Sequence, residues 1–209
     1  MRQRRRFGLI AVLLFVAGVA AACYLPDKFI AEIRLGKNGD YALHYIGDLT
    51  WAPLYRDIKE GRVPPEKIQE KIDLIEKDLK RDTNFTKVES LGDARFRVEY
   101  ERQGRLAPSE QVTFVRRNAI ILMIRSHPDG RITVDGNTLK PSDAQMATTL
   151  GLGVEGEFRV VTDGYVKQQN ASQIKPFGPY RVYIWTIQNA FSPSPHFVMQ
   201  REGAWPSQP

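Results

Sequence analysis

Apolar and polar residues alternate in two successive runs between Asp27 and Leu49. Apolar side chains occupy every second position in Phe29–Leu35 and again in Tyr41–Tyr45, and a Gly- and Asn-containing stretch separates the two runs. A two-residue period is typical of a β-strand with one buried face, and a short Gly/Asn-rich connection is typical of a hairpin. The pattern therefore predicts a β-hairpin at the start of the folded part of the chain.

The period changes to that of a helix in Glu66–Arg81. Apolar residues recur there at spacings of four, three and four, and Pro64-Pro65 stands directly before the segment. Such spacing places the apolar side chains on one stripe of an α-helix, and a helix of this kind usually turns its stripe towards the core. Shorter helices are expected at Trp51–Ile58 and at Pro141–Leu150.

Most of the remaining apolar segments predict strands. Ala119–Ile124 is almost wholly apolar, so we expect it to be a central strand that is buried on both faces. The other predicted strands are Phe85–Ser90, Ala94–Glu101, Arg131–Asp135, Glu155–Thr162, Tyr165–Lys167, Tyr180–Ile187 and Phe197–Gln200.

This order of elements predicts an α+β fold. We expect a mainly antiparallel, curved sheet with one long amphipathic helix packed on it and short additional helices. A turn at His127-Pro-Asp-Gly predicts a second hairpin that continues into Arg131–Asp135. The two predicted hairpins argue against a doubly wound parallel sheet. Residues 23–200 are expected to form a single α+β domain, and residues 201–209, which are polar or rich in proline, a flexible tail.

The first 22 residues have the pattern of a signal peptide. The basic start MRQRRR is followed by Phe7–Ala21, an uncharged apolar stretch of 15 residues. This length fits the apolar region of a signal peptide and is short for a membrane-spanning helix, which needs about 20 residues. An uncleaved signal anchor and a soluble periplasmic protein stay open as alternatives. Each places the rest of the chain across the inner membrane.

The end of this segment resembles a bacterial lipobox. Ala20-Ala21-Ala22 precedes Cys23, although a lipobox prefers Leu at the position of Ala20. Cys23 is the only cysteine, so an internal disulfide is impossible, and acylation would remove an exposed, oxidisable thiol. We therefore expect a lipoprotein whose Cys23 carries acyl chains such as palmitate, with the membrane as its first partner. Its expected location is the cell envelope, on the periplasmic face of the outer membrane if the bacterium is Gram-negative.

The net charge adds weight to this interpretation. The formal charge is +6, but Arg2, Arg4, Arg5 and Arg6 supply four of the positive charges. The chain after residue 22 has 26 Lys and Arg against 24 Asp and Glu, which is close to neutral. The high isoelectric point therefore reflects a targeting signal, and we expect no nucleic-acid partner.

The sequence contains no recognisable catalytic or metal-binding motif. His44, His127 and His196 are far apart, and none has a second ligand residue at the usual spacing. The GxGxxG match at Gly151–Gly156 lies after a predicted helix and before a predicted strand, which is the reverse of a dinucleotide fingerprint. We expect a helix C-cap there instead. No cofactor and no enzymatic activity are expected.

Aromatic residues are the remaining candidates for binding. Trp51 and Tyr55 follow the first hairpin, and Phe177, Tyr180 and Trp185 lie in the aromatic-rich last third. They could form core, an apolar groove, or a membrane-facing edge with rings at headgroup level. The leading hypothesis is a non-enzymatic binding module for an envelope protein partner or an amphiphilic ligand. The alternatives are a periplasmic lipid carrier with an apolar cavity under the long helix, and an unrecognised envelope hydrolase.

Part of the chain resembles the LppM-like group of bacterial envelope lipoproteins. The matching features are the signal with Cys23, the early hairpin with its Gly39-Asp40 turn, and the stretch Val154–Ile187, which contains EFRVVTDGYVKQQNA and a YIWTI strand. The resemblance implies a membrane-tethered α/β module that is suggested to bind lipid or to act at the envelope. It carries over no catalytic residue.

Overall fold

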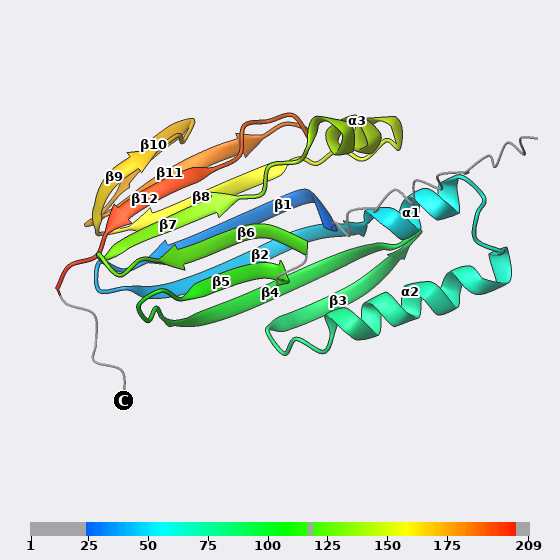
Figure 1. Ribbon diagram of the computed structural model, residues 1–209, viewed down its shortest axis with the longest axis horizontal. Coiled ribbons are helices and arrows are strands. Elements are labelled where there is room, and N and C mark those ends of the chain that lie inside the picture. The colour runs from blue at the N-terminus through cyan, green and yellow to red at the C-terminus, as the bar shows by residue number, and fades with distance from the viewer. Residues whose placement is uncertain (1–23, 117–118, 204–209) are drawn as a thin grey trace, which may run out of the picture.

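The computed structural model describes residues 24–116 and 119–203. Strands make up 52% of the described residues and helices 18%, as twelve strands and three helices (Figure 1). Cys23 and the expected signal peptide lie outside the described residues, as do residues 204–209.

The described strands form two sheets. The large sheet has the order β10-β11-β8-β1-β2-β4-β3, and the small sheet has the order β5-β6-β7-β12-β9. Strand β8 runs parallel to β1, whereas the other neighbours that pair in the large sheet are antiparallel. The large sheet consists of β1 (Tyr24–Leu35), β2 (Asp40–Trp51), β3 (Phe85–Gly92), β4 (Arg95–Arg105), β8 (Gly156–Thr162), β10 (Gln173–Phe177) and β11 (Tyr180–Ile187). The small sheet consists of β5 (Gln111–Arg116), β6 (Ala119–Ser126), β7 (Arg131–Gly136), β9 (Tyr165–Gln169) and β12 (His196–Gln200).

The core lies between the two sheets. Phe114 of the small sheet is fully buried, and its ring centroid lies 4.6 Å from that of Tyr45 and 4.8 Å from that of Tyr100 in the large sheet. The alternation seen in the sequence sends Ile33 and Tyr45 into this core and leaves Arg34 towards solvent. The first predicted hairpin is confirmed, since β1 and β2 pair along their length.

The expected α+β fold, with one long helix packed on a sheet, is wrong. The protein is mostly β, and the inner face of the large sheet is covered by the second sheet. Helix α2 (Pro65–Leu79) instead lies against β3, the last strand of the large sheet, and buries only Ile72 and Leu79 completely. The period identified the helix correctly but carried no information about which strands share a sheet.

The two short helices lie near their expected positions. Helix α1 spans Ala52–Lys59, and α3 spans Pro141–Thr149. Strand β6 departs from its prediction. It is an inner strand of its sheet, but Ile120 and Ile121 are only half-buried while Leu122 and Ile124 face the core. An apolar outer face made the strand look buried on both sides.

Candidate functional site

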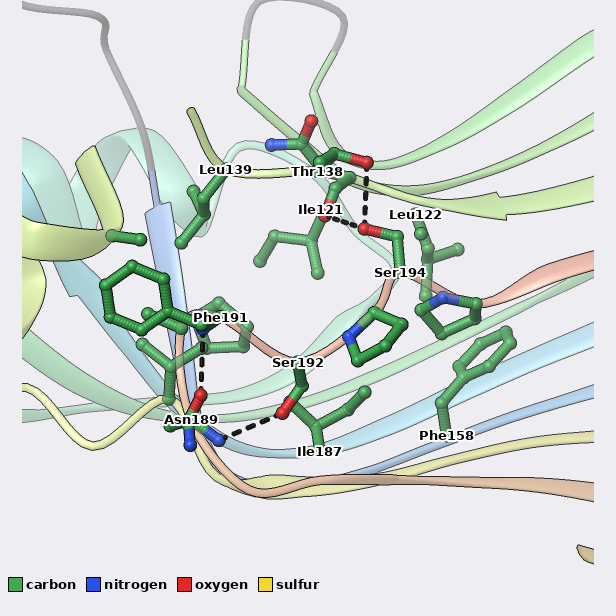
Figure 2. Close-up of a pocket in the computed structure, with 18 of the residues that line it drawn as sticks. Ile121, Leu122, Thr138, Leu139, Phe158, Ile187, Asn189, Phe191, Ser192 and Ser194 are labelled. Atoms are coloured by element: carbon green, nitrogen blue, oxygen red, sulfur yellow. Dashed lines mark hydrogen bonds between the residues drawn. The ribbon is translucent and has the colours of Figure 1, made fainter. Parts of the chain in front are cut away.

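An apolar cavity of about 320 Å³ opens between the two sheets (Figure 2). Strands β1 and β8 of the large sheet line it with Phe29, Ala31 and Phe158, and β6 of the small sheet lines it with Ile121 and Leu122. Because residues at alternate positions of β1 face the same side, Phe29 and Ala31 both reach this space. The cavity is therefore a gap within the sandwich, next to its main core.

Small residues leave this gap open. A Cβ atom at Gly156 would lie 2.4 Å from the ring of Phe29, so the glycine lets that ring pack directly against the β8 backbone. Ala31 of β1 and Ala144 of α3 are almost fully buried and also line the cavity. Since protein interiors are normally close-packed, larger side chains at these positions would be expected to fill such a space.

The segment between β11 and β12 forms the third wall. We call residues 188–195 the strap. The Asn189 side chain accepts a hydrogen bond from the backbone N–H of Phe191 (2.9 Å), and the hydroxyl of Ser192 accepts one from the N–H of Gln188 (3.0 Å). The Ser194 hydroxyl lies 2.9 Å from that of Thr138, as Figure 2 shows. The strap is thus held to itself and to the chain after β7.

The cavity offers no charge to a ligand. Its lining comprises 22 residues, and Asp, Glu, Lys, Arg and His are absent from that set. Burial raises the pKa of Tyr24 to about 12, so the phenol in the lining is neutral at physiological pH. Apart from this phenol, the side-chain hydroxyl and amide groups among the described lining residues belong to the strap and to the facing segment at Asn137 and Thr138. A space of this kind suits an apolar chain, and its volume lies at the lower end of the roughly 300–1,000 Å³ typical of ligand pockets.

A second hollow lies on the outer face of the large sheet. It has a volume of about 870 Å³ and is lined by side chains of both charges, among them Glu32, Arg34, Arg159 and Lys175. The Arg34 guanidinium pairs with the Glu32 carboxylate at 2.8 Å. Since the charges in this groove largely neutralise one another, it has no clear preference for an anionic or a cationic ligand.

The five aromatic candidates are not brought together. Phe177 and Tyr180 lie on the exposed β10–β11 hairpin and border the outer groove. Trp51 packs on Tyr24, with ring centroids 4.7 Å apart. Tyr55 is buried in α1, and its hydroxyl donates to the Leu150 carbonyl (3.5 Å). None of the five lines the inter-sheet cavity.

Trp185 lies next to the cavity without lining it. Its ring centroid is 5.3 Å from that of Phe158, and its Nε1–H donates to the Asn170 side-chain oxygen at 2.7 Å. The same oxygen accepts the backbone N–H of His196 at 2.7 Å, and the Asn170 amide donates to the Ser194 carbonyl at 2.9 Å. Trp185 therefore supports the cavity wall and helps hold the two sheets together.

The cavity does not lie where the sequence placed it. The lipid-carrier alternative put an apolar space under the long helix, but α2 contributes no lining residue. The residues that form the cavity come from five separate segments between Tyr24 and Pro195. A local signal existed only for the strap, where Phe191 is followed by Pro193 and Pro195.

The histidines lie at three separate places. His44 pairs with Glu101 at 3.5 Å, His196 with Asp135 at 2.7 Å, and the His127 ring lies 3.3 Å from the Thr133 hydroxyl. Within residues 24–116 and 119–203, no group of three or more His, Cys, Asp or Glu side chains could hold a metal ion.

The glycine-rich segment Gly151–Gly156 lies between a helix and a strand, as the sequence predicted. Gly151 follows the helix with a φ of +70°, and its N–H donates to the Thr148 carbonyl, before β8 begins at Gly156. A positive φ just after a helix is typical of a C-cap, and the C-cap prediction is confirmed.

The described part of the chain contains no helix with the length and apolar character needed to cross a membrane.

Comparison with solved structures gives distant likenesses, of which one is described below. No family model matches the chain, and no curated protein matches it. The NMR structure of the folded domain of the Mycobacterium tuberculosis LppM protein aligns over 88% of this chain and 94% of that domain, with 10% identity and a TM-score of 0.39. A likeness at this level does not show that the chain belongs to that group.

Proposed function

We propose that this chain is a membrane-anchored protein of the bacterial envelope that binds the apolar chain of an amphiphile in the cavity between its sheets. The observation that carries the proposal is the cavity itself, which is bounded by two sheets and a strap and has no charged residue among the described residues that line it. Apolar ligands gain free energy when such a space removes them from water, since the gain scales with the apolar area buried.

The position of the cavity supports this function. Tyr24 and Pro26 line the cavity and lie within three residues of Cys23 in the chain. If Cys23 is acylated, these residues hold the cavity close to the membrane in which amphiphiles reside. The polar groups at Thr138 and Ser194 would then lie beside the headgroup of a bound molecule.

The chemistry of the lining favours binding over catalysis. Ser192 and Ser194 place hydroxyl groups at the strap, but within the described part of the chain no histidine, lysine or carboxylate shares the lining with them. A serine nucleophile needs an adjacent base to become reactive, and the cavity offers none. We therefore propose a binding role for the protein without an enzymatic step.

The experiment is photolabelling of the full-length chain, purified and reconstituted in vesicles, with a fatty acid that carries a photoreactive group on its acyl chain. Ala190 is half-buried in the strap and lines the cavity, so Ala190→Trp should obstruct the space and lower labelling about tenfold or more. Ala42→Trp adds the same bulk on the outer groove and should leave labelling unchanged. Equal labelling of the two variants would contradict the proposed cavity.

The anchor is tested separately. Cys23→Ala should abolish incorporation of labelled palmitate in cells and release the protein from the membrane fraction. Unchanged fractionation together with absent acylation would indicate an uncleaved signal anchor. Loss of the anchor should leave photolabelling of the purified chain intact, so the two parts of the proposal can fail independently.

A further inference from the structure

One edge of the sandwich is formed by the free edges of both sheets. Strand β10 ends the order of the large sheet, and β9 ends that of the small sheet. The short link at residues 170–172 joins them, so the chain passes from the last strand of one sheet to the last strand of the other at this edge. The side chain of Asn170 ties this link to Trp185 and His196. We call residues 165–181 the open edge.

Large apolar side chains are exposed on the open edge. Tyr165 is 68% exposed, Ile174 48%, Phe177 67% and Tyr180 41%. Four of the eight exposed large hydrophobic side chains among the described residues therefore fall on this one short segment. Singly exposed apolar residues need no explanation, but a cluster of them marks an interaction surface.

The open edge is also purely basic. The sequence from Gly164 to Arg201 contains no Asp or Glu. Lys167, Lys175 and Arg181 are exposed, and none of them belongs to an ion pair found within the described residues. The flanking acids are already engaged: the Asp163 carboxylate accepts the Lys37 N–H (2.8 Å), and Glu202 pairs with the Lys37 ammonium (3.2 Å).

We propose that the open edge docks on the surface of an anionic lipid bilayer. Aromatic side chains favour the headgroup region, and basic residues are attracted by the negative surface potential of anionic lipids. The open edge supplies both groups and carries no acid of its own. The acids of the adjoining outer groove, Glu32, Asp40 and Glu157, are each paired with an arginine. A second protein strand is a poorer occupant, because Lys175 and Pro176 stand in β10 and proline has no N–H with which to extend a sheet.

This contact is distinct from the N-terminal anchor and from the cavity. Arg181 pairs with Thr162, and Thr162 pairs with Leu35, so the β10–β11 turn lies at the end of β1 opposite to Tyr24. Strand β1 has 12 residues, which at about 3.3 Å each separate its ends by roughly 40 Å. The inference therefore concerns a second membrane contact and does not depend on what the cavity holds.

The test is site-specific photocrosslinking of the full-length chain, reconstituted in phosphatidylglycerol-containing or pure phosphatidylcholine vesicles. A benzophenone amino acid replaces Phe177 in one sample and Leu74 in the other. Leu74 is 61% exposed on α2 and provides a matched apolar control away from the open edge. We expect lipid adducts at position 177 in the anionic vesicles, at least roughly tenfold more than at position 74 or in phosphatidylcholine alone.

Charge variants give the second readout. Lys167→Gln combined with Lys175→Gln and Arg181→Gln should reduce the adducts at position 177 about tenfold or more, as should high salt. An unchanged melting temperature of the triple variant would show that it remains folded. Equal adducts at positions 177 and 74, adducts insensitive to lipid charge, or adducts to protein only would each overturn the inference.

Discussion

The two edges of the sandwich differ, because a helix covers one of them and leaves the other exposed. At one edge, β3 of the large sheet and β5 of the small sheet are joined by α2, which packs on β3 and reaches β5 through the Asp78–Arg116 ion pair at 2.8 Å. At the other edge, none of the three described helices covers β9 or β10 (Figure 1). This edge presents exposed aromatic and basic side chains.

The two edges differ in how the exposed backbone of the last strand is protected. Exposed sheet edges invite pairing with other chains, so proteins cover them or place charges and proline on them. The α2 edge uses a cover from the same chain. The open edge uses Lys175 and Pro176, which prevent strand addition but leave the surface free for a partner that needs no backbone hydrogen bonds.

Removing an isoleucine from each edge should give the largest contrast. Ile72 of α2 is 1% exposed, so Ile72→Ala should lower the free energy of unfolding by about 2–5 kcal/mol through lost burial and a cavity. Ile174 of β10 is 48% exposed, and Ile174→Ala should change the free energy of unfolding by less than about 0.5 kcal/mol. Urea denaturation of the two variants measures both values. Similar losses would mean that the open edge is part of the stabilising core.

A smaller effect should appear at alkaline pH, beside the covered edge. Burial raises the pKa of Tyr24 to about 12, while the charges of Arg116 and Asp78 act on it in opposite directions. An unfolded tyrosine titrates near about pH 10, so between about pH 10 and 12 only the unfolded state loses the proton. Stability should therefore fall as the pH rises, by roughly 2–3 kcal/mol from this group.

The measurement is the free energy of unfolding as a function of pH for the wild type and for Tyr24→Phe. The variant should keep more of its stability above about pH 10. Burial also raises the pKa of Tyr45, so some alkaline loss should persist in the variant. Two superimposable profiles would show that Tyr24 does not resist ionisation in the folded protein.

The smallest effect is expected at the ion pair of the covered edge. Asp78→Asn should destabilise the protein by less than about 1 kcal/mol, because both side chains are partly exposed, and the difference should shrink in high salt. Lys175→Gln on the open edge should leave the urea midpoint unchanged. A larger loss at Lys175 would contradict its description as an unpaired surface cation.

The sequence was most informative where a local period or a proline marks an element. Pro64-Pro65 and the four-three-four spacing located α2 almost to the residue. Strand β10 was missed because Pro176 argues against a strand, although an edge strand tolerates it. Strand β5 (Gln111–Arg116) was missed as well. Pairing within two separate sheets is set by contacts between distant segments, so the period of any one strand could not show it.

The site was harder to predict than the fold. Phe29 and Ala31 look like ordinary inward positions of β1, and nothing nearby in the sequence indicates that they border an empty space. The ring of Phe29, which lines that space, packs against Gly156, and the two residues meet only through the parallel pairing of β1 with β8. Aromatic content drew attention to Trp51 and Tyr55, which the structure uses as packing residues.

The parallel pairing of β1 with β8 also has a consequence for the order of folding. During synthesis from the N-terminus, β1 and β2 can form their hairpin early. The pairing of β1 with β8, from Phe29–Gly156 to Leu35–Thr162, can form only after β8 has been synthesised. Closing so long a loop carries an entropic cost and makes non-local pairing slow. The nascent chain therefore keeps one flank of its first strand unpaired until its last third has been made.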